Sequence, residues 1–222
     1  VKYVDNVWHA LKVSFANEIG GLCKGLGIDS HEVMDIFCQD TKLNLSPYYM
    51  TPGFAFGGSC LPKDVRALTY KARTLDLNLP VLQSIMPSNQ NQVETGLRMI
   101  TSLGKKRIGV LGFSFKAGTD DLRESPLVEV IERLLGKGYD LRIYDRNVSL
   151  AKLMGANRDY LLNHIPHISS LMVESLEAIL EHAEVIVIGN KAKEFAEVPA
   201  RIKPGRVVVD LVRVNPQASE DG

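Results

Sequence analysis

The sequence has no excess of either charge, few cysteines and no long hydrophobic run. Its 26 basic and 26 acidic residues cancel, so no global field favours nucleic acid or an anionic membrane. The cysteines are Cys23, Cys38 and Cys60, and their odd number and wide spacing support neither a disulfide framework nor a CxxC zinc site. No apolar run approaches the ~20 residues of a membrane helix. We therefore expect a cytoplasmic, soluble protein with no nucleic-acid partner, no membrane contact and no metal.

Two further features are missing. The chain starts at Val1 rather than at a methionine, and no capping residue precedes the first helical residues. No GxGxxG dinucleotide fingerprint occurs anywhere in the sequence. We therefore expect a fragment that begins inside or just before a helix, and no ordinary dinucleotide site within it.

The first half has helical periodicity. Between residues 1 and 26, apolar side chains recur every three or four positions, which predicts one long helix that Gly25 and Gly27 suit as an end. Asp29 is placed to cap a second helix that runs to about Cys38. Further helices are expected over 62–74 and 81–103, where Pro87 predicts a kink or a late start.

The second half has strand-like apolar runs at 107–111, 141–144, 185–188 and 207–211, with a helix over 126–135 and a further short strand within 162–173. Strands that alternate with helices indicate a doubly wound parallel sheet. The fold class is therefore α/β: an all-helical domain over 1–103, followed by a Rossmann-like domain over 104–222.

The first helix carries a polar face. Lys2, Asn6 and His9 follow one another at i, i+4 and i+7, and Asn17 continues the same face. This pattern fits an ordinary solvated surface. It equally fits the wall of a site in which an ammonium and an amide stabilise an oxyanion.

A glycine-rich segment, GFAFGGSCLPKD (53–64), surrounds Cys60. Glycines allow a backbone to approach a ligand closely, and the neighbouring Lys63 would stabilise a thiolate that could attack a carbonyl carbon. The alternative is a buried structural cysteine, as we expect for Cys23 and Cys38. The nearby aromatic residues Tyr48, Tyr49, Phe54 and Phe56 fit either a sugar or base platform or the core.

The loop after the first strand, GVLGFSFKAGTDDLRESP (109–126), stands where α/β folds hold nucleotides. Lys116 and Arg123 could contact phosphate or carboxylate there, or be incidental surface charges. Asp145, at the end of the second strand, resembles the ribose-binding acid of dinucleotide folds, although the glycine fingerprint that should accompany it is absent.

These segments carry a family resemblance that covers essentially the whole chain. GFAFGGSCLPKD resembles the catalytic cysteine segment of nucleotide-sugar dehydrogenases, and FKAGTDDLRESP resembles their nucleotide-domain signature. KYVDNVWHALKVSFANEIG resembles their long central helix. The three occur in the order found in the UDP-glucose/GDP-mannose dehydrogenase family. Their residues resemble those of members that act on GDP-mannose more than those of members that act on UDP-glucose.

The resemblance implies an NAD-dependent four-electron oxidation of a sugar C6 alcohol to a uronate. In this chemistry Cys60 forms a thiohemiacetal and then a thioester, Lys2 and Asn6 stabilise an oxyanion, and Asp64 helps to handle the hydrolytic water. Lys63 and Arg123 match cofactor contacts. The positions that match substrate contacts are His9, Asn17, Tyr48, Tyr49, Phe54, Gly57 and Lys116.

The resemblance also implies partners and one departure. The family dimerises through the long helix, so a homodimer or higher homo-oligomer is expected, with a nucleotide sugar as ligand. NAD would be bound mainly by a domain that this chain lacks, so the isolated chain should be inactive. Thr51 stands where close GDP-mannose relatives should carry a basic residue, which puts one contact in doubt.

Three alternatives stay open. The substrate could be UDP-glucose or another UDP sugar. A 3-hydroxyacid dehydrogenase also uses a Lys-x-x-x-Asn helix, although Cys60 and residues 105–222 argue against it. A non-enzymatic, dimeric nucleotide-sugar-binding module would fit the chain as it stands.

Overall fold

The computed structural model describes residues 1–46, 53–114, 118–148 and 166–214, and gives the backbone alone for 3–7, 9–10 and 13–14. The chain packs as two compact units. One comprises residues 1–52 and 63–88, and the other comprises residues 53–62 and 89–222. Because packing defines these units, the proposed domain boundary at 103/104 stays a prediction.

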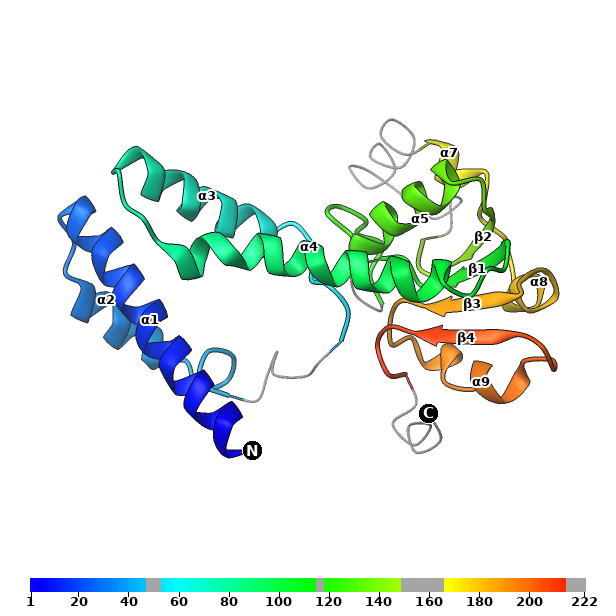
Figure 1. The fold of residues 1–222 in the computed structure, drawn as a ribbon, viewed down its shortest axis with the longest axis horizontal. Coiled ribbons are helices and arrows are strands. Elements are labelled where there is room, and N and C mark those ends of the chain that lie inside the picture. The colour runs from blue at the N-terminus through cyan, green and yellow to red at the C-terminus, as the bar shows by residue number, and fades with distance from the viewer. Residues whose placement is uncertain (47–52, 115–117, 149–165, 215–222) are drawn as a thin grey trace. The chain divides into compact units, whose positions relative to one another are not determined.

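The first unit is helical. It contains α1 (Lys2–Leu26), α2 (Ser30–Cys38), most of α3 (Leu61–Thr74) and the first part of α4 (Pro80–Thr101) (Figure 1). Its buried core consists of Leu22, Ala72, Leu79 and Leu82. The α-helix predicted over 1–26 is confirmed, and the helix predicted from 81 begins at Pro80 and includes Pro87, so the late start is wrong.

The ends of these helices follow from local chemistry. Gly27 takes the left-handed conformation, with φ 70°, and its N–H donates to the carbonyls of Cys23 and Lys24. Asp29 caps α2 by accepting from the N–H groups of His31 (2.8 Å) and Glu32 (3.5 Å), as the sequence predicted.

The second unit is built on a parallel sheet of order β2-β1-β3-β4 (Figure 1). Its strands are β1 (Arg107–Leu111), β2 (Asp140–Tyr144), β3 (Val185–Ile188) and β4 (Val207–Asp210). All four were predicted within one residue at each end. Connections leave β1 toward β2 on one side, and return to β3 on the other, so the topological switch point lies between β1 and β3.

Helices cover both faces of this sheet. The C-terminal part of α4 and α5 (Pro126–Gly136) pack on one face in a single buried cluster that includes Ile100, Ile131 and Ile143. The other face packs against α8 (Leu176–His182), the 3₁₀ turn η1 (Lys193–Phe195) and α9 (Val198–Arg201). α7 (Pro166–Ser169) precedes Met172, which forms an isolated parallel bridge with Ile143.

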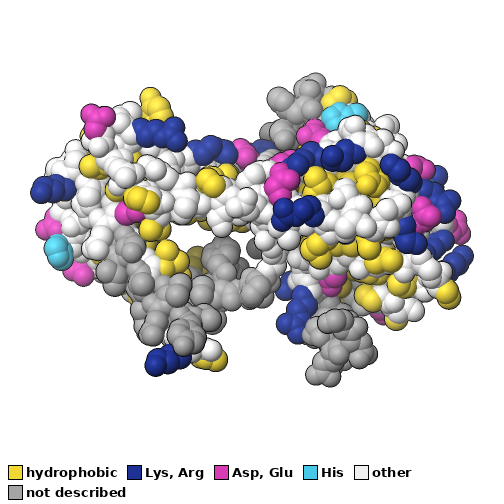
Figure 2. Space-filling model, in the orientation of Figure 1, with side chains coloured by type: hydrophobic (Ala, Val, Ile, Leu, Met, Phe, Trp, Pro, Cys, Tyr) yellow, Lys and Arg dark blue, Asp and Glu magenta, His cyan; other side chains and the backbone are white. Residues whose placement is uncertain are grey.

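The approach of α8 to the sheet requires a glycine in β1. A Cβ on Gly109 would stand 2.5 Å from Cγ2 of Ile179. On the face of this unit seen in Figure 2, side chains of both charges are interspersed with hydrophobic ones. This mixture agrees with the balanced composition.

Candidate functional site

The segment that leads to the cysteine is held on α4. The Asn89 side-chain amide bonds the Phe56 backbone in both directions: its Oδ1 accepts from the Phe56 N–H (2.9 Å), and its Nδ2 donates to the Phe56 carbonyl (2.9 Å). Gln92 donates to the Gly53 carbonyl at 2.7 Å. The Phe54 ring lies so close to Gly96 that a Cβ there would be 2.6 Å from its Cε2. Phe54 thus packs on the helix and the core of the second unit.

Gly57 brings the same segment against the start of α5. A Cβ on Gly57 would lie 2.3 Å from the Glu124 carbonyl oxygen and 2.7 Å from Cδ of Pro126. Gly58 follows in a left-handed conformation (φ 84°). Cys60 then ends the segment as an exposed residue, with its Sγ 3.9 Å from the Ser59 hydroxyl. The alternative that Cys60 is a buried structural cysteine is therefore wrong, whereas Cys23 is buried as expected.

Arg123 is clamped by a carboxylate on the loop after β1. Asp121 accepts from the Arg123 Nε (2.8 Å), Nη2 (2.8 Å) and backbone N–H (3.0 Å). The hydrogen bonds from Arg123 lower the pKa of Asp121. The pKa of Arg123 is raised, first by its hydrogen bonds to Asp121 and then by that carboxylate's charge. Because Gly57 packs against Glu124, the segment that carries Cys60 lies beside the turn that carries Arg123.

The sequence did not single out Asp121 as a site residue. The signal was available, since an aspartate two residues before an arginine can both accept the backbone N–H of a tight turn and pair with the guanidinium.

Asp145 does not act as a ribose-binding acid. It is 4% exposed, and its Oδ2 accepts from the Phe113 N–H (3.1 Å), the Ser114 N–H (3.3 Å) and the Ser114 hydroxyl (3.0 Å). The carboxylate is thus used inside the protein. The hypothesis that it resembles the acid of dinucleotide folds was wrong, because the fingerprint that opens such a site is replaced here by a loop folded back on the aspartate.

The residues that follow β1 and β3 lie close together at the switch point. A Cβ on Gly112 would be 2.4 Å from Cγ of Asn190, and one on Gly189 would be 2.4 Å from the Gly112 carbonyl. Glycine is therefore required at both positions, at the edge of the sheet where doubly wound folds hold nucleotides.

The remaining predicted site residues lie in the first unit or outside the described residues. Lys2 and Asn17 are exposed on α1, and Asn6 and His9 belong to the same helix. Lys63 and Asp64 stand in the first turn of α3, where the ammonium pairs with the carboxylate at 3.5 Å and both are exposed. The predicted residues that lie outside the described residues are Tyr48, Tyr49 and Lys116, together with the departure Thr51.

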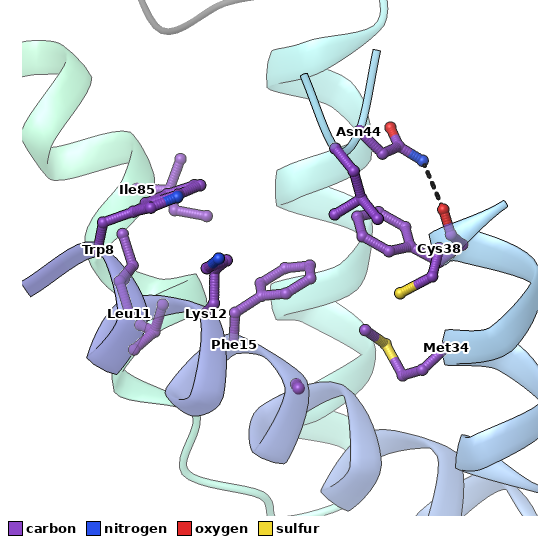
Figure 3. Close-up of a pocket in the computed structure, with 12 residues that line it drawn as sticks. Trp8, Leu11, Lys12, Phe15, Met34, Cys38, Asn44 and Ile85 are labelled. Atoms are coloured by element: carbon purple, nitrogen blue, oxygen red, sulfur yellow. Dashed lines mark hydrogen bonds between the residues drawn. The ribbon is translucent and has the colours of Figure 1, made fainter. Parts of the chain in front are cut away.

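The first unit also contains an apolar pocket that the sequence did not reveal. Its volume is about 620 Å³, and α1, α2 and α4 supply Trp8, Phe15, Met34 and Ile85 among its walls (Figure 3). Cys38, which we expected in the core, is exposed and lines this pocket. The reason is that α2 buries none of its residues completely, since its apolar face borders the pocket.

No helix in the described residues is long and apolar enough to cross a membrane. No group of three or more His, Cys, Asp or Glu side chains among them could hold a metal ion.

Comparison with known sequences gives a consistent assignment. The model of the UDP-glucose/GDP-mannose dehydrogenase family, central domain, matches residues 1–91. The model of the UDP binding domain of the same family matches residues 109–216. The GDP-mannose 6-dehydrogenase of Pseudomonas aeruginosa is 56% identical over 219 residues, which are 99% of this chain and 50% of the relative. That of Azotobacter vinelandii is 51% identical over 98% of this chain and 50% of its own length.

Solved structures agree. A ternary complex of GDP-mannose dehydrogenase from Pseudomonas aeruginosa matches with a TM-score of 0.93 and 57% identity, over 97% of this chain and 49% of that one. A UDP-glucose dehydrogenase from Pyrobaculum islandicum matches with a TM-score of 0.64 and 33% identity, over 97% and 47%. The chain spans about half the length of the curated relatives it matches. Its sequence and its fold place it in the UDP-glucose/GDP-mannose dehydrogenase family.

Proposed function

We propose that this chain supplies the nucleophile and the nucleotide-sugar site of an NAD-dependent GDP-mannose 6-dehydrogenase, which makes GDP-mannuronate. One observation carries the proposal. In a chain 56% identical to a GDP-mannose 6-dehydrogenase, Cys60 is exposed at the end of a segment that Gly57 packs against the Arg123–Glu124 turn. A core cysteine would be inert, whereas an exposed one is accessible to a substrate.

The chemistry proposed for Cys60 follows from its thiol. Removal of a hydride from C6 and a proton from its hydroxyl gives an aldehyde, and NAD is the hydride acceptor in both oxidations. The sulfur adds to the aldehyde carbon and the oxygen gains a proton, which yields a thiohemiacetal. Loss of a second hydride and the hydroxyl proton gives a thioester. Water then releases the uronate and restores the thiol, so four electrons leave the sugar.

Other side chains are assigned to supporting roles. Lys2 and Asn6 are proposed to donate to the C6 oxygen while it carries negative charge, and Asp64 to orient the hydrolytic water. Lys63 and Arg123 are proposed contacts of the cofactor. The proposed contacts of the nucleotide sugar are His9, Asn17, Tyr48, Tyr49, Phe54, Gly57 and Lys116.

The principal NAD site is proposed to lie outside the residues of this chain. The absence of a GxGxxG fingerprint from the sequence supports this proposal. On this proposal the isolated chain binds the sugar nucleotide but does not transfer hydride.

A homodimer is proposed to form through α1, in the cytoplasm. The helix presents Trp8 (38% exposed) and Leu11 (43% exposed) beside the apolar pocket of the first unit (Figure 3). Large side chains of this kind beside a hollow are typical of surfaces that another protein covers.

Replacement of Cys60 by serine tests the nucleophile. In the intact dehydrogenase, Cys60→Ser should abolish GDP-mannuronate formation, measured by chromatography, because a hydroxyl is a far weaker nucleophile toward the aldehyde. Cys38→Ser is the matched control, since Cys38 is also exposed, and it should keep its activity. Full uronate formation by the Cys60 variant would exclude covalent catalysis by this residue.

The substrate is tested by a thermal-shift comparison. GDP-mannose should raise the unfolding temperature of the chain more than UDP-glucose does, because only binding to the folded state stabilises it. The opposite order would favour the alternative of a UDP-sugar dehydrogenase, whose supporting observation is the 33% identical structure from Pyrobaculum islandicum.

A further inference from the structure

We propose that Asp145 is a positioning residue: acting through Phe113 and Ser125, its buried carboxylate fixes the turn that carries Arg123 and against which Gly57 packs. Asp145 follows β2, and its carboxylate accepts from residues 113, 114, 147 and 190. The effect would pass through a chain of hydrogen bonds between described residues. Its meaning for catalysis rests on the proposed function, whereas the mechanical link does not.

The first link joins Asp145 to the residues after β1. Oδ2 accepts from the backbone N–H groups of Phe113 (3.1 Å) and Ser114 (3.3 Å) and from the Ser114 hydroxyl (3.0 Å). Asn190, from the end of β3, donates to the Ser114 hydroxyl at 3.2 Å and reaches Oδ2 at 3.5 Å. Oδ1 accepts from the Asn147 N–H at 3.0 Å, which fixes the orientation of the carboxylate itself.

Burial restricts which side chains this cluster can tolerate. Asp145 and Asn190 are each 4% exposed and Ser114 is 2% exposed. Bulk water does not reach groups buried this deeply. If the acceptor, which faces several donors, were replaced by a donor, a polar group would be left without a partner. Phe113 is pinned as well, since its side chain is fully buried in the main core.

The second link joins Phe113 to the Arg123 turn. The Ser125 hydroxyl donates to the Phe113 carbonyl at 2.6 Å. The N–H of Phe113 thus bonds Asp145, while its carbonyl bonds Ser125. The Ser125 N–H donates to the Leu122 carbonyl at 3.1 Å, which closes a turn around Arg123 and Glu124. Glu124 takes an unusual left-handed conformation there (φ 55°).

The last link reaches the cysteine segment. The strained Glu124 presents the carbonyl that stands 2.3 Å from the position of a Gly57 Cβ. A shift of Phe113 would therefore be felt by Ser125, by the Arg123 guanidinium and by the backbone three residues before Cys60. Strained backbone persists only where its surroundings hold it in place, and the buried Asp145 cluster is connected to this turn through Phe113 and Ser125.

The test compares Asp145→Asn and Ser125→Ala with a control in the intact dehydrogenase. Asp145→Asn keeps the shape but turns an amide toward donors, and Ser125→Ala removes only the second link. Glu94→Gln is the control, because it weakens the Glu94–Arg133 ion pair of the same unit without touching the loop. Amide hydrogen exchange at Ser125 reports the position of the turn, and KM for NAD and kcat report the site.

We expect both variants to speed exchange at Ser125 and to raise KM for NAD roughly tenfold, with kcat changed far less. Glu94→Gln should change neither the exchange at Ser125 nor the KM for NAD, even where it lowers thermal stability as much as they do. The double variant Asp145→Asn with Ser125→Ala should change both quantities no more than the stronger single variant does. Unchanged exchange at Ser125 in Asp145→Asn would overturn the mechanical link. Faster exchange with an unchanged KM would overturn the role in the site. Should Asp145→Asn fail to fold, Ser125→Ala decides by the same measurements.

A wild-type enzyme without dehydrogenase activity would refute the proposed function alone, since the exchange experiment would still decide the mechanical link.

Discussion

Replacement of Gly57 by alanine should disable the proposed site without unfolding the protein. The new methyl group would stand 2.3 Å from the Glu124 carbonyl oxygen, whereas ordinary contacts of a Cβ begin at 3.4 Å. One backbone segment must therefore retreat by about 1 Å, the difference between these distances. Neither can move freely, because Asn89 holds the cysteine segment and Pro126 begins α5.

The magnitude follows from the geometry of attack. A nucleophile must stand within a few tenths of an ångström of its productive position, and a misplacement of about 1 Å costs roughly 100-fold in rate. The overpacking itself should cost about 1–3 kcal/mol of stability. We therefore expect kcat of the intact dehydrogenase to fall about 100-fold in Gly57→Ala, while the protein remains folded at room temperature.

Gly53→Ala is the matched control. It lies in the same segment, but its Cβ would approach only the Leu211 carbonyl, at an ordinary 4.0 Å. Reduction of NAD with saturating GDP-mannose measures kcat, and circular dichroism checks the fold. The reasoning is refuted if the two folded variants differ in kcat by less than about threefold.

Three other predictions concern stability and ionisation. Ile131→Ala should lower the free energy of unfolding by about 2–5 kcal/mol in denaturant titrations, because Ile131 is fully buried; Ile36→Ala, at a 62% exposed position, should change it little, and equal effects would contradict this core. Glu18→Gln should cost about 1–2 kcal/mol, because the Glu18 carboxylate accepts from two N–H groups in the first turn of α4, at 2.6 and 2.8 Å; an unchanged denaturation midpoint would count against this cap. Arg123→Met should raise the pKa of Asp121 toward its ordinary value of about 3.9, as followed by carboxyl NMR, because Arg123 lowers that pKa. The stabilisation by this pair is present above the ordinary carboxyl pKa and is lost as the pH falls through the lowered pKa of Asp121; a pKa that does not move would refute it.

The long first helix and the strands could be predicted from the sequence, and the short helices could not. The apolar stripe of α1 repeats along the helix, β2 alternates apolar and polar residues, and β1, β3 and β4 lie in short apolar runs, so their positions follow from local pattern. α8 and α9 have seven and four residues, too few to show a helical period, and none was predicted there. Their helical form depends on packing against the sheet, as the contact between Ile179 and Gly109 illustrates.

The candidate site divides in the same way. Motif and resemblance identified Cys60, Gly57 and Arg123 as members of it. The reason that Gly57 must be a glycine lies in a carbonyl 67 positions further along the chain, and spacing within one segment cannot reveal it. Asp145 was misjudged for a similar reason: its place after a strand suggested a ligand, whereas the loop after β1 consumes its hydrogen-bonding capacity.

Asn89 shows how a side chain can stand in for the main chain. Its amide offers the same donor and acceptor as a peptide group. It therefore satisfies both backbone groups of Phe56, as a neighbouring strand would do in a sheet. An aspartate has the right shape but would set an oxygen against the Phe56 carbonyl, and a leucine would leave both backbone groups unmet. The identity of this residue is thus dictated by the need to complete one peptide's hydrogen bonding.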